Sequence, residues 1–454
     1  MSRRVLVIGA GASGLMAAAA AAGQGCRVTV LEKNEKAGKK IYITGKGRCN
    51  LTNNCDPEAF FAHVVRNPKF LYSSYYGFDK EAVMDFFEEN GCPVKTERGG
   101  RVFPVSDHAS DITAALLRRL RELHVEIRYH AEVRRLLTEP VTQLPEAQEL
   151  PEAGRKGKKQ KGPQHRVLGA ELASGEILQA DAVILCTGGL SYPSTGSTGD
   201  GLVWAEALGL ACTPAAPSLV PFAVAEPWCA QLQGLALKNV SLRISDPAGA
   251  GTGKKKHRPL YEGFGEMLFT HFGISGPLVL SASAVCEADQ RGPLSAVIDL
   301  KPALTQEQLR ARLDKDFSES PQKSLRNVLR GLLPARLSET VTDLFCEAES
   351  AAEPDGPLPD PEMRCASLPA RRRDRLAAFL KAVPLTITGT RGFGEAVVTR
   401  GGISVKEIDP STMQVKRVEG LYAAGELLDV DAYTGGFNLQ IAWSTGHLAG
   451  ASVR

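Results

Sequence analysis

The chain has 454 residues and a formal net charge of +3, with 43% hydrophobic and 23% charged residues. This composition is typical of a soluble globular protein, and the length predicts two or three folding units. The small net charge gives no reason to expect a nucleic acid or an anionic membrane as a partner, and no apolar run approaches the about 20 residues that cross a bilayer.

The first predicted element is an apolar strand that runs directly into the motif G-x-G-x-x-G at residues 9–14. A helix follows, and a second apolar strand ends in Glu32. In such a β-α-β unit the first glycine permits a tight turn, the second lets the backbone approach a pyrophosphate, and the third lets the helix pack on the strand. Glu32 stands where a ribose hydroxyl pair needs an acceptor. The residues predicted to bind the nucleotide are Gly9, Gly11, Ala12, Ser13, Gly14 and Glu32.

The first strand begins near residue 4, which leaves no room for a signal or transit peptide, and we therefore expect a cytoplasmic protein. The ten cysteines are scattered without a C-x-x-C pair, and the eight histidines are equally dispersed. Zinc sites and dithiol redox pairs require close spacings, so we expect no metal site. Cys49 has no partner cysteine nearby, which favours a structural thiol over a redox thiol.

Residues 57–122 are predicted to be mainly helical, because apolar residues recur every three or four positions. Strands are predicted at 125–137 and 166–186. Between them, residues 139–165 are rich in Pro, Glu, Gln, Lys and Gly and contain the basic run 155–161. We interpret this segment as a disordered excursion at the tip of a hairpin. The basic run is then a solvated loop or, alternatively, a contact to RNA or another anion.

A second glycine-rich turn at 187–201 follows a buried strand and precedes a helix, the position at which α/β sheets bind ligands. From about residue 214 the chain changes to short strands and proline or glycine turns, and then to helices. We interpret residues 214–384 as an inserted cap or substrate domain, between two parts of one nucleotide-binding domain at 1–213 and 385–454. The segments predicted in and after the insert are strands at 218–225, 239–245, 266–271 and 385–408, a surface loop at 247–258, helices at 305–317, 323–348 and 370–382, and a proline-rich linker at 354–361.

The C-terminal stretch repeats the geometry of the N-terminus. A strand ends near Gly425, a glycine-rich turn follows, and an alanine-containing helix is predicted at 441–450. Such a helix can aim its N–H groups at a second part of the same cofactor. NAD needs no second site so close to the chain end, whereas FAD does, because its isoalloxazine lies far from its adenosine. We therefore predict FAD; the alternative is a glycine-rich loop that only closes the sheet.

Several segments stand in a distinctive order along the chain. They are the motif at 9–14 with Glu32, G-K-G-R-C-N-L-T-N at 45–53, the glycine turn at 187–201, F-T-H-F-G-I-S-G-P at 269–277, and the stretch 425–438 that leads through T-G-G-F-N-L-Q. Together they resemble the BaiN/YhiN-type flavoproteins, also catalogued as aminoacetone-oxidase-like NAD(P)/FAD-dependent oxidoreductases. The resemblance covers nearly the whole chain. It implies an α/β fold with a Rossmann-like FAD-binding domain of glutathione-reductase type, interrupted by an inserted β-barrel plus helical domain. One characterised activity in this group is reduction of the 3-oxo-Δ4,6 bile-acid nucleus in gut anaerobes.

In a flavoenzyme the flavin carries the redox chemistry, and the protein supplies binding, orientation and electrostatics. Lys33, Lys40 and Arg48 are candidates for phosphate or flavin contacts, since a cation stabilises the negative charge of reduced flavin. The alternative for the lysines is an ordinary surface role. By its position in the related fold, Val133 is expected to place its backbone amide on the adenine. The remaining predicted cofactor residues are Asn50, Thr187, Gly188, Gly189, Gly425, Glu426, Gly436, Phe437 and Asn438.

The expected function is reduction of a C=C bond in a small apolar 3-oxo-Δ4,6 enone of the bile-acid or steroid type. Hydride passes to the β-carbon, and a positioned acid protonates the α-carbon. Candidates for the acid are His271, Tyr433 and Tyr192, each of which can instead cap a turn or pack. NADH or NADPH is the expected transient donor, and the chain holds no second G-x-G-x-x-G for it. Alternatives are an FAD-dependent amine oxidase and a tRNA-modifying flavoprotein that uses the basic loop. The oligomeric state stays open.

Overall fold

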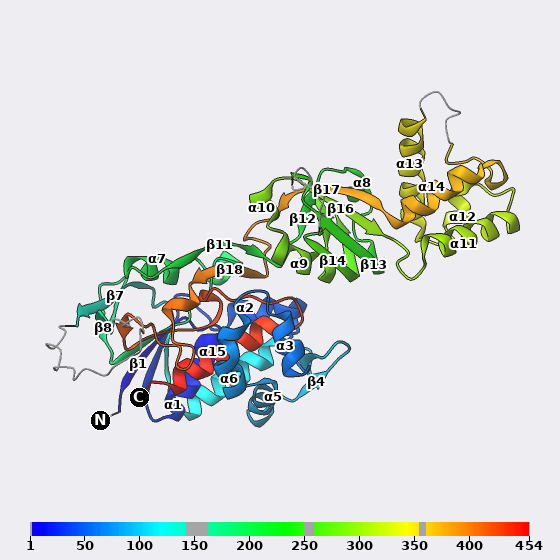
Figure 1. Cartoon of the computed structure of the whole chain (residues 1–454). Coiled ribbons are helices and arrows are strands. Elements are labelled where there is room, and N and C mark those ends of the chain that lie inside the picture. Colours follow the sequence, from blue (N-terminus) through cyan, green and yellow to red (C-terminus); the bar gives the residue numbers. More distant parts are fainter. Residues whose placement is uncertain (1, 142–161, 249–257, 354–359, 454) are drawn as a thin grey trace, which may run out of the picture. The chain divides into compact units, whose positions relative to one another are not determined.

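The computed structural model describes residues 2–141, 162–248, 258–353 and 360–453, which form two compact units (Figure 1). Unit 1 combines Met1–Ser218 with Gly392–Arg454, and unit 2 is Leu219–Arg391. Each unit has its own hydrophobic core. The chain therefore leaves unit 1 once, completes unit 2, and returns to finish unit 1.

A five-stranded parallel sheet forms the centre of unit 1. Its strands lie in the order β20 (Leu421–Ala423), β10 (Ala182–Leu185), β1 (Arg4–Ile8), β2 (Arg27–Leu31) and β6 (Glu126–Arg128). β10 is buried at every residue, and β1 is buried after its first residue. A parallel sheet that is covered on both faces requires such continuous apolar runs. The predicted α/β fold is confirmed.

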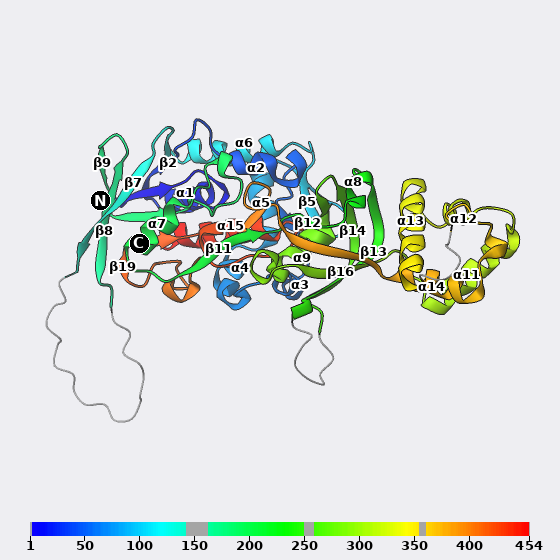
Figure 2. The ribbon, with the colours of Figure 1, turned by 90° about the horizontal axis from the view of Figure 1, so that it is seen from above.

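The first and last long helices of unit 1, α1 (Ala12–Gly23) and α15 (Phe437–Ala451), lie side by side (Figures 1 and 2). A Cβ at Gly446 would come within 2.3 Å of the Ser13 carbonyl oxygen, so only glycine permits this approach. The prediction of this last helix at 441–450 starts too late. It begins at Phe437 because Gly436, in the left-handed conformation, is its N-cap residue.

Unit 1 also contains a small antiparallel sheet within the region predicted to be helical. It pairs β3 (Thr52–Asn53) with β5 (Arg101–Pro104) and β5 with β4 (Val94–Thr96), so the helical prediction is wrong for this part. Strands this short show no period in the sequence, and the pairing of β5 with both β3 and β4 decides them. The helices of this region are α2 (Lys39–Ile43), α3 (Pro57–His63), α4 (Tyr72–Gly77), α5 (Lys80–Glu89) and α6 (Ala109–Glu122).

Two further sheets belong to unit 1. β7 (Val133–Pro140) and β8 (His165–Leu172) pair as the predicted hairpin, and β9 (Ile177–Gln179) and β19 (Val418–Glu419) also pair with β8. The basic run 155–161 between β7 and β8 lies outside the described residues. After α7 (Asp200–Ala207), strand β11 (Cys212–Ser218) pairs with β18 (Val398–Ile403), where the chain leaves unit 1 and returns.

Unit 2 is built on a closed barrel, which confirms the predicted inserted barrel. The strands follow the order β12 (Phe222–Val224), β15 (Gly273–Ser275), β14 (Tyr261–Thr270), β13 (Ala236–Ser245), β16 (Leu294–Asp299) and β17 (Val383–Thr390). Alternate residues of β13 and β16 point into the core, as expected for strands with one buried face. The helices that accompany the barrel are α8 (Trp228–Gln231), α9 (Pro277–Cys286) and α10 (Ala288–Arg291).

A helical part follows within unit 2, made of α11 (Gln306–Glu319), α12 (Leu325–Leu329), α13 (Ala335–Ala352) and α14 (Ala370–Lys381). The prediction of one helix over 323–348 is wrong, because the chain forms α12 and α13 instead. Pro334 is the N-cap residue of α13, with a non-helical ψ of 143°, and a proline there cannot continue the preceding helix. Most of the predicted linker at 354–361 and of the surface loop at 247–258 lies outside the described residues.

Candidate cofactor site

In the turn between β1 and α1, two glycines are in tight contact with neighbouring backbone, and the third has free space around it. Gly9 has φ +101°, and a Cβ there would lie 2.4 Å from the Cys186 carbonyl oxygen. A Cβ at Gly14 would lie 1.9 Å from the Gly9 carbonyl oxygen. Apart from its own chain neighbours, no described atom comes within 4 Å of a Cβ at Gly11. The turn therefore packs on the sheet and leaves open space over Gly11, where a pyrophosphate approaches in this type of fold.

Helix α1 begins at this turn without a capping side chain from the described residues. Gly11 is its N-cap residue, and the first turn carries no acidic residue. The first N–H groups of a helix have no partner within the helix, and the helix dipole favours negative charge at this end. The backbone N–H groups of Ala12 and Ser13 are thus available donors for a phosphate.

Glu32 is held beside the same turn. Its side chain is 8% exposed, and Oε2 accepts a hydrogen bond from the Ala10 N–H at 2.9 Å. Oε1 accepts from the backbone N–H and the side-chain amide of Asn34, at 2.8 and 2.6 Å. A carboxylate has about four acceptor positions, so this oriented group retains capacity for a ribose hydroxyl. Asn34 was missed at the sequence level, although it follows Glu32 closely.

The C-terminal glycine turn lies against the N-terminal one. Gly425 has φ +74°, and a Cβ there would lie 2.4 Å from the Ser13 hydroxyl oxygen. The Gly425 N–H donates to Thr445 Oγ1 at 3.0 Å, which ties the turn to α15. The fold therefore brings together two turns that the sequence places at opposite ends of the chain.

The N-terminus of α15 is shaped by the polar loop at 44–53. Gly436 has φ +100°, and a Cβ there would lie 2.3 Å from the Thr52 carbonyl oxygen. Asn53 Nδ2 donates to the Gly435 carbonyl at 2.9 Å. Asn438 uses its amide to donate to and accept from the backbone of Ala432. No side chain in the described ranges caps α15, so its first N–H groups offer a second donor site, as FAD requires.

Both lysines among the predicted cationic contacts have a carboxylate partner. Lys33 Nζ lies 2.6 Å from Asp200 Oδ2, and Lys40 Nζ lies 2.6 Å from Glu426 Oε2. Ser191 is fully buried and donates to Glu426 Oε1 at 2.6 Å. Lys40 and Glu426, both predicted cofactor residues, are thus brought together, and Ser191 completes a cluster that the motif search missed.

Arg48 is held in a similar way. Its Nε donates to Asp107 Oδ1 at 2.9 Å, it also pairs with Glu97, and its guanidinium lies 4.1 Å from the centre of the Phe103 ring. The hydrogen bond from Arg48 lowers the pKa of Glu97, and Lys95 and Arg48 together lower the pKa of Asp107. The charge of Arg48 is therefore largely matched by protein carboxylates, and a flavin contact of this residue stays a prediction.

The remaining predicted cofactor residues lie in three places of unit 1. The turn after β10 packs closely, since a Cβ at Gly189 would lie 2.4 Å from Thr399 Oγ1 and one at Gly188 would lie 2.9 Å from Ser197 Oγ. Asn50 Oδ1 accepts from the Val102 N–H at 3.1 Å, which joins the polar loop to β5. Val133 and Thr187 lie at the start of β7 and directly after Cys186, and Phe437 is 3% exposed at the start of α15. Their contacts with a cofactor stay predictions.

The three candidate proton donors lie in different parts of the chain. The Tyr433 N–H donates to the His63 carbonyl at 3.0 Å, and the His63 ring stacks on Phe437 with centroids 4.4 Å apart. Tyr192 lies in the turn after β10 with φ +51°, and burial raises the pKa of its phenol. His271 is exposed on unit 2, at the turn between β14 and β15. Tyr433 and Tyr192 thus belong to the unit that carries the glycine turns, and His271 belongs to the other unit.

Within the described ranges no group of three or more His, Cys, Asp or Glu side chains is arranged to hold a metal ion. All ten cysteines are free thiols, and burial raises the pKa of Cys49 to about 12. A thiol with that pKa carries no thiolate near neutral pH, which fits the structural interpretation of Cys49. No helix among the described residues combines the length and the apolar character needed to cross a bilayer.

Comparison with known proteins covers both units. The model of the HI0933-like protein Rossmann domain matches residues 3–452. A 3-dehydro-bile acid delta(4,6)-reductase of Clostridium scindens is 32% identical over 99% of this chain and 98% of its own. Two proteins named ribosomal RNA dihydrouridine synthase are also similar to this chain. The protein of Escherichia coli is 29% identical over 97% of this chain and 95% of its own length. The protein of Haemophilus influenzae is 31% identical over 99% of this chain and 98% of its own length.

Proposed function

Since the chain belongs to the HI0933-like family of Rossmann-domain proteins, we propose that it reduces a C=C bond that is conjugated to a carbonyl group. It is a flavin-dependent oxidoreductase with a Rossmann-type FAD-binding domain. The observation that carries the proposal is the 32% identity, over 99% of the chain, to a reductase of a 3-oxo-Δ4,6 nucleus.

The two activities named among the relatives share one chemical step. A delta(4,6)-reductase saturates double bonds in conjugation with the 3-oxo group. A dihydrouridine is a uridine whose C5=C6 bond, conjugated to the C4 carbonyl, has been saturated. Both steps add hydride to the β-carbon and a proton to the α-carbon. This shared step is the part of the function that all of these relatives support.

The described residues fit FAD at both of its ends. The turn at 9–14 and Glu32 would hold the adenosine half, and the N-terminus of α15 would hold the flavin half. When bound and reduced, FAD would supply the hydride for the β-carbon of the substrate. The protein must then stabilise the charge on the carbonyl oxygen and deliver a proton to the α-carbon. We assign the proton delivery to Tyr433, Tyr192 or His271, and the reducing equivalents to NADH or NADPH as a transient donor.

The favoured substrate is a flat, apolar 3-oxo-Δ4,6 enone of the bile-acid or steroid class, in which two double bonds require the cycle twice. A second candidate is a uracil base in ribosomal RNA. It is favoured by the two dihydrouridine synthases, which are nearly as similar to this chain as the bile-acid reductase. Binding to RNA through phosphates would weaken steeply as salt concentration rises.

An anaerobic titration of the holoprotein tests the proposal. NADH should bleach the visible flavin band, and a 3-oxo-4,6-diene should restore it with formation of the saturated ketone. If only an unmodified ribosomal RNA fragment restores the band, and dihydrouridine is formed, the second candidate holds. If neither acceptor restores it, while an amine yields peroxide in air, the protein is an oxidase and the proposal is wrong. Protein that stays colourless in excess FAD contradicts it altogether.

A further inference from the structure

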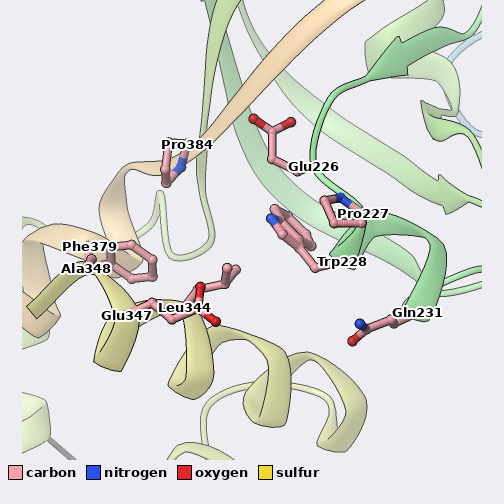
Figure 3. Close-up of a pocket in the computed structure, with 9 residues that line it drawn as sticks. All are labelled: Glu226, Pro227, Trp228, Gln231, Leu344, Glu347, Ala348, Phe379 and Pro384. Carbon is pink, nitrogen blue, oxygen red and sulfur yellow. The ribbon is translucent and has the colours of Figure 1, made fainter. Parts of the chain in front are cut away.

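Unit 2 contains a pocket with a volume of about 500 Å³, and all of its lining residues belong to this unit. Figure 3 shows Trp228 and Glu226 on the barrel side of this pocket, and Phe379, Leu344 and Glu347 on the side of the helices. The barrel side comes from α8 and the segment before it, and the other side from α13 and α14. The walls are thus mostly apolar, with carboxylates on both sides.

Trp228 supplies a polar group to an otherwise apolar wall. Its side chain packs against Phe269, with ring centroids 5.7 Å apart, and only 8% of the residue is exposed. Its indole N–H donates to no acceptor among the described residues. In Figure 3 the indole nitrogen lies on the edge of the ring turned toward Phe379 and Pro384. With no acceptor in the described part of the chain, this N–H is free to donate to a molecule in the pocket.

The carboxylates of the pocket have no cationic partner. Glu226 accepts a hydrogen bond from the Thr386 N–H at 2.9 Å, which orients it, and Glu347 is exposed on α13. Neither forms an ion pair with a described residue, and none of the lining residues is Lys, Arg or His. Arg336 donates to the backbone carbonyl of Gln231, which lines the pocket, and to that of Gln233 at 3.3 Å. Its guanidinium is held by these carbonyls and forms no ion pair with Glu226 or Glu347, so both carboxylates remain available to a ligand.

We propose that this pocket binds an organic cation, a protonated amine on an apolar stem that also carries an oxygen acceptor. The carboxylates attract the ammonium group, and the aromatic rings favour a cation over a neutral head group. The apolar walls cover the stem, and the indole N–H of Trp228 donates to the oxygen. An anion is repelled by the same carboxylates. The inference concerns unit 2 alone and does not rest on the proposed reductase activity.

A matched series of small probes tests this assignment by calorimetric titration of the full-length holoprotein. The probe is 2-amino-1-phenylethanol, which carries an ammonium group, a ring and a hydroxyl group. Its uncharged counterpart 1-phenyl-1,2-ethanediol should bind about fivefold more weakly, as expected for the loss of a partly exposed ion pair. The affinity of the ammonium probe should also fall with ionic strength. Equal affinity of the two probes, or no saturable binding of the ammonium probe, would overturn the assignment.

Variants locate the binding in this pocket. Glu347→Gln changes an exposed residue. It should lower the affinity of the ammonium probe about fivefold and leave the affinity of the diol unchanged. Trp228→Phe keeps an aromatic ring and removes the N–H. Wild-type protein should bind the ammonium probe more tightly than 2-phenylethylamine, which lacks the hydroxyl group, and the variant should bind both with equal affinity. Glu339→Gln is the control, since Glu339 is also on α13 but pairs with Arg330 at 2.7 Å and does not line the pocket. Unchanged binding in Glu347→Gln, or an equal loss in the control, contradicts the proposal even if Trp228→Phe fails to fold.

Discussion

Gly425 packs directly on Ser13, so closely that a Cβ on Gly425 would lie 2.4 Å from the Ser13 hydroxyl oxygen. Ser13 lies in the first turn of α1, and Gly425 lies in the turn after β20. The contact joins the first and the last βα segment of unit 1. It therefore fixes the turn after β20 against the turn to which we assign the adenosine half of FAD.

Gly425→Ala should separate these turns. The clash with Ser13 and the positive φ together predict a loss of about 1–3 kcal/mol in the free energy of unfolding, with weaker FAD binding. Gly175→Ala is the matched control, because Gly175 has φ +86° but no described atom beyond its own chain neighbours within 4 Å of its Cβ position. The control should show only the strain of the left-handed conformation, about 1 kcal/mol, and unchanged FAD affinity. Thermal unfolding and flavin titration measure both effects, and equal behaviour of the two variants contradicts the prediction.

Gly11→Ala and Gly14→Ala should separate cofactor binding from folding. Gly11 has φ −83° and open space around its Cβ position, so the apoprotein should change by less than about 0.5 kcal/mol, while FAD binds at least about tenfold more weakly. In Gly14→Ala the new Cβ meets the Gly9 carbonyl oxygen, so the fold itself should lose about 3 kcal/mol or more. Apoprotein melting and flavin titration are the measurements. Wild-type FAD affinity in Gly11→Ala would show that the open space is not the pyrophosphate site.

Removal of the true proton donor should lower turnover without loss of flavin. Tyr433→Phe, Tyr192→Phe and His271→Asn are the variants to compare, and the donor should show a drop in kcat of about 10²–10⁴. Because burial raises the pKa of Tyr192, its phenol remains protonated into the alkaline range, and activity that depends on it should persist there. Flavin absorbance per protein serves as the control. A variant that keeps full activity removes that residue from the mechanism.

The buried thiols predict a loss of stability at alkaline pH. Burial raises the pKa of Cys186 and Cys286 from 9.0 to about 12. Above pH 9.0 the unfolded chain therefore loses thiol protons that the folded protein keeps, so the free energy of unfolding falls as pH rises toward about 12. Urea unfolding under reducing conditions at several pH values measures this slope.

Cys286→Ala tests the origin of that slope. The variant should release about one proton fewer on unfolding in the alkaline range and behave like the wild type in its pH dependence below it. Cys26→Ala is the control, since Cys26 is only partly buried. If the free energy of unfolding of Cys286→Ala falls with pH as steeply as that of the wild type, groups other than Cys286 cause the loss of stability at alkaline pH.

Loss of the Glu349 side chain should destabilise unit 2 by more than the loss of an exposed carboxylate does. Its side chain is 4% exposed and lies 3.2 Å from Arg372 and 2.6 Å from Arg375. Glu349→Ala removes the nearer carboxylate of the buried Arg372 guanidinium, which keeps a longer pair with Glu353 at 3.7 Å, so the variant should lose about 3 kcal/mol in the free energy of unfolding. Glu262→Ala is the matched control, because its pair with Arg243 is more than half exposed and should be worth less than about 1 kcal/mol. Similar losses in the two variants, measured by urea unfolding, would contradict the argument.

The amino-acid sequence by itself determined the first β-α-β unit, which ends at Glu32, and its resemblance to a known family implied the inserted barrel. The β-α-β unit is a local feature, because its turn needs glycine where the backbone has a positive φ or another segment comes close, and parallel strands need apolar runs. The short strands β4 and β5 and the break before α13 were not predicted, since a few residues carry no period of their own.

Only the tertiary structure decided which charges meet. Lys33 pairs with a carboxylate 167 positions away, and Lys40 with one 386 positions away. Gly425 packs on Ser13, and Trp228 and Glu347 line one pocket, although the two residues of each pair lie far apart in the chain. Such contacts depend on how helices and strands pack after they form, because electrostatic partners are chosen by distance in space and not by spacing along the sequence.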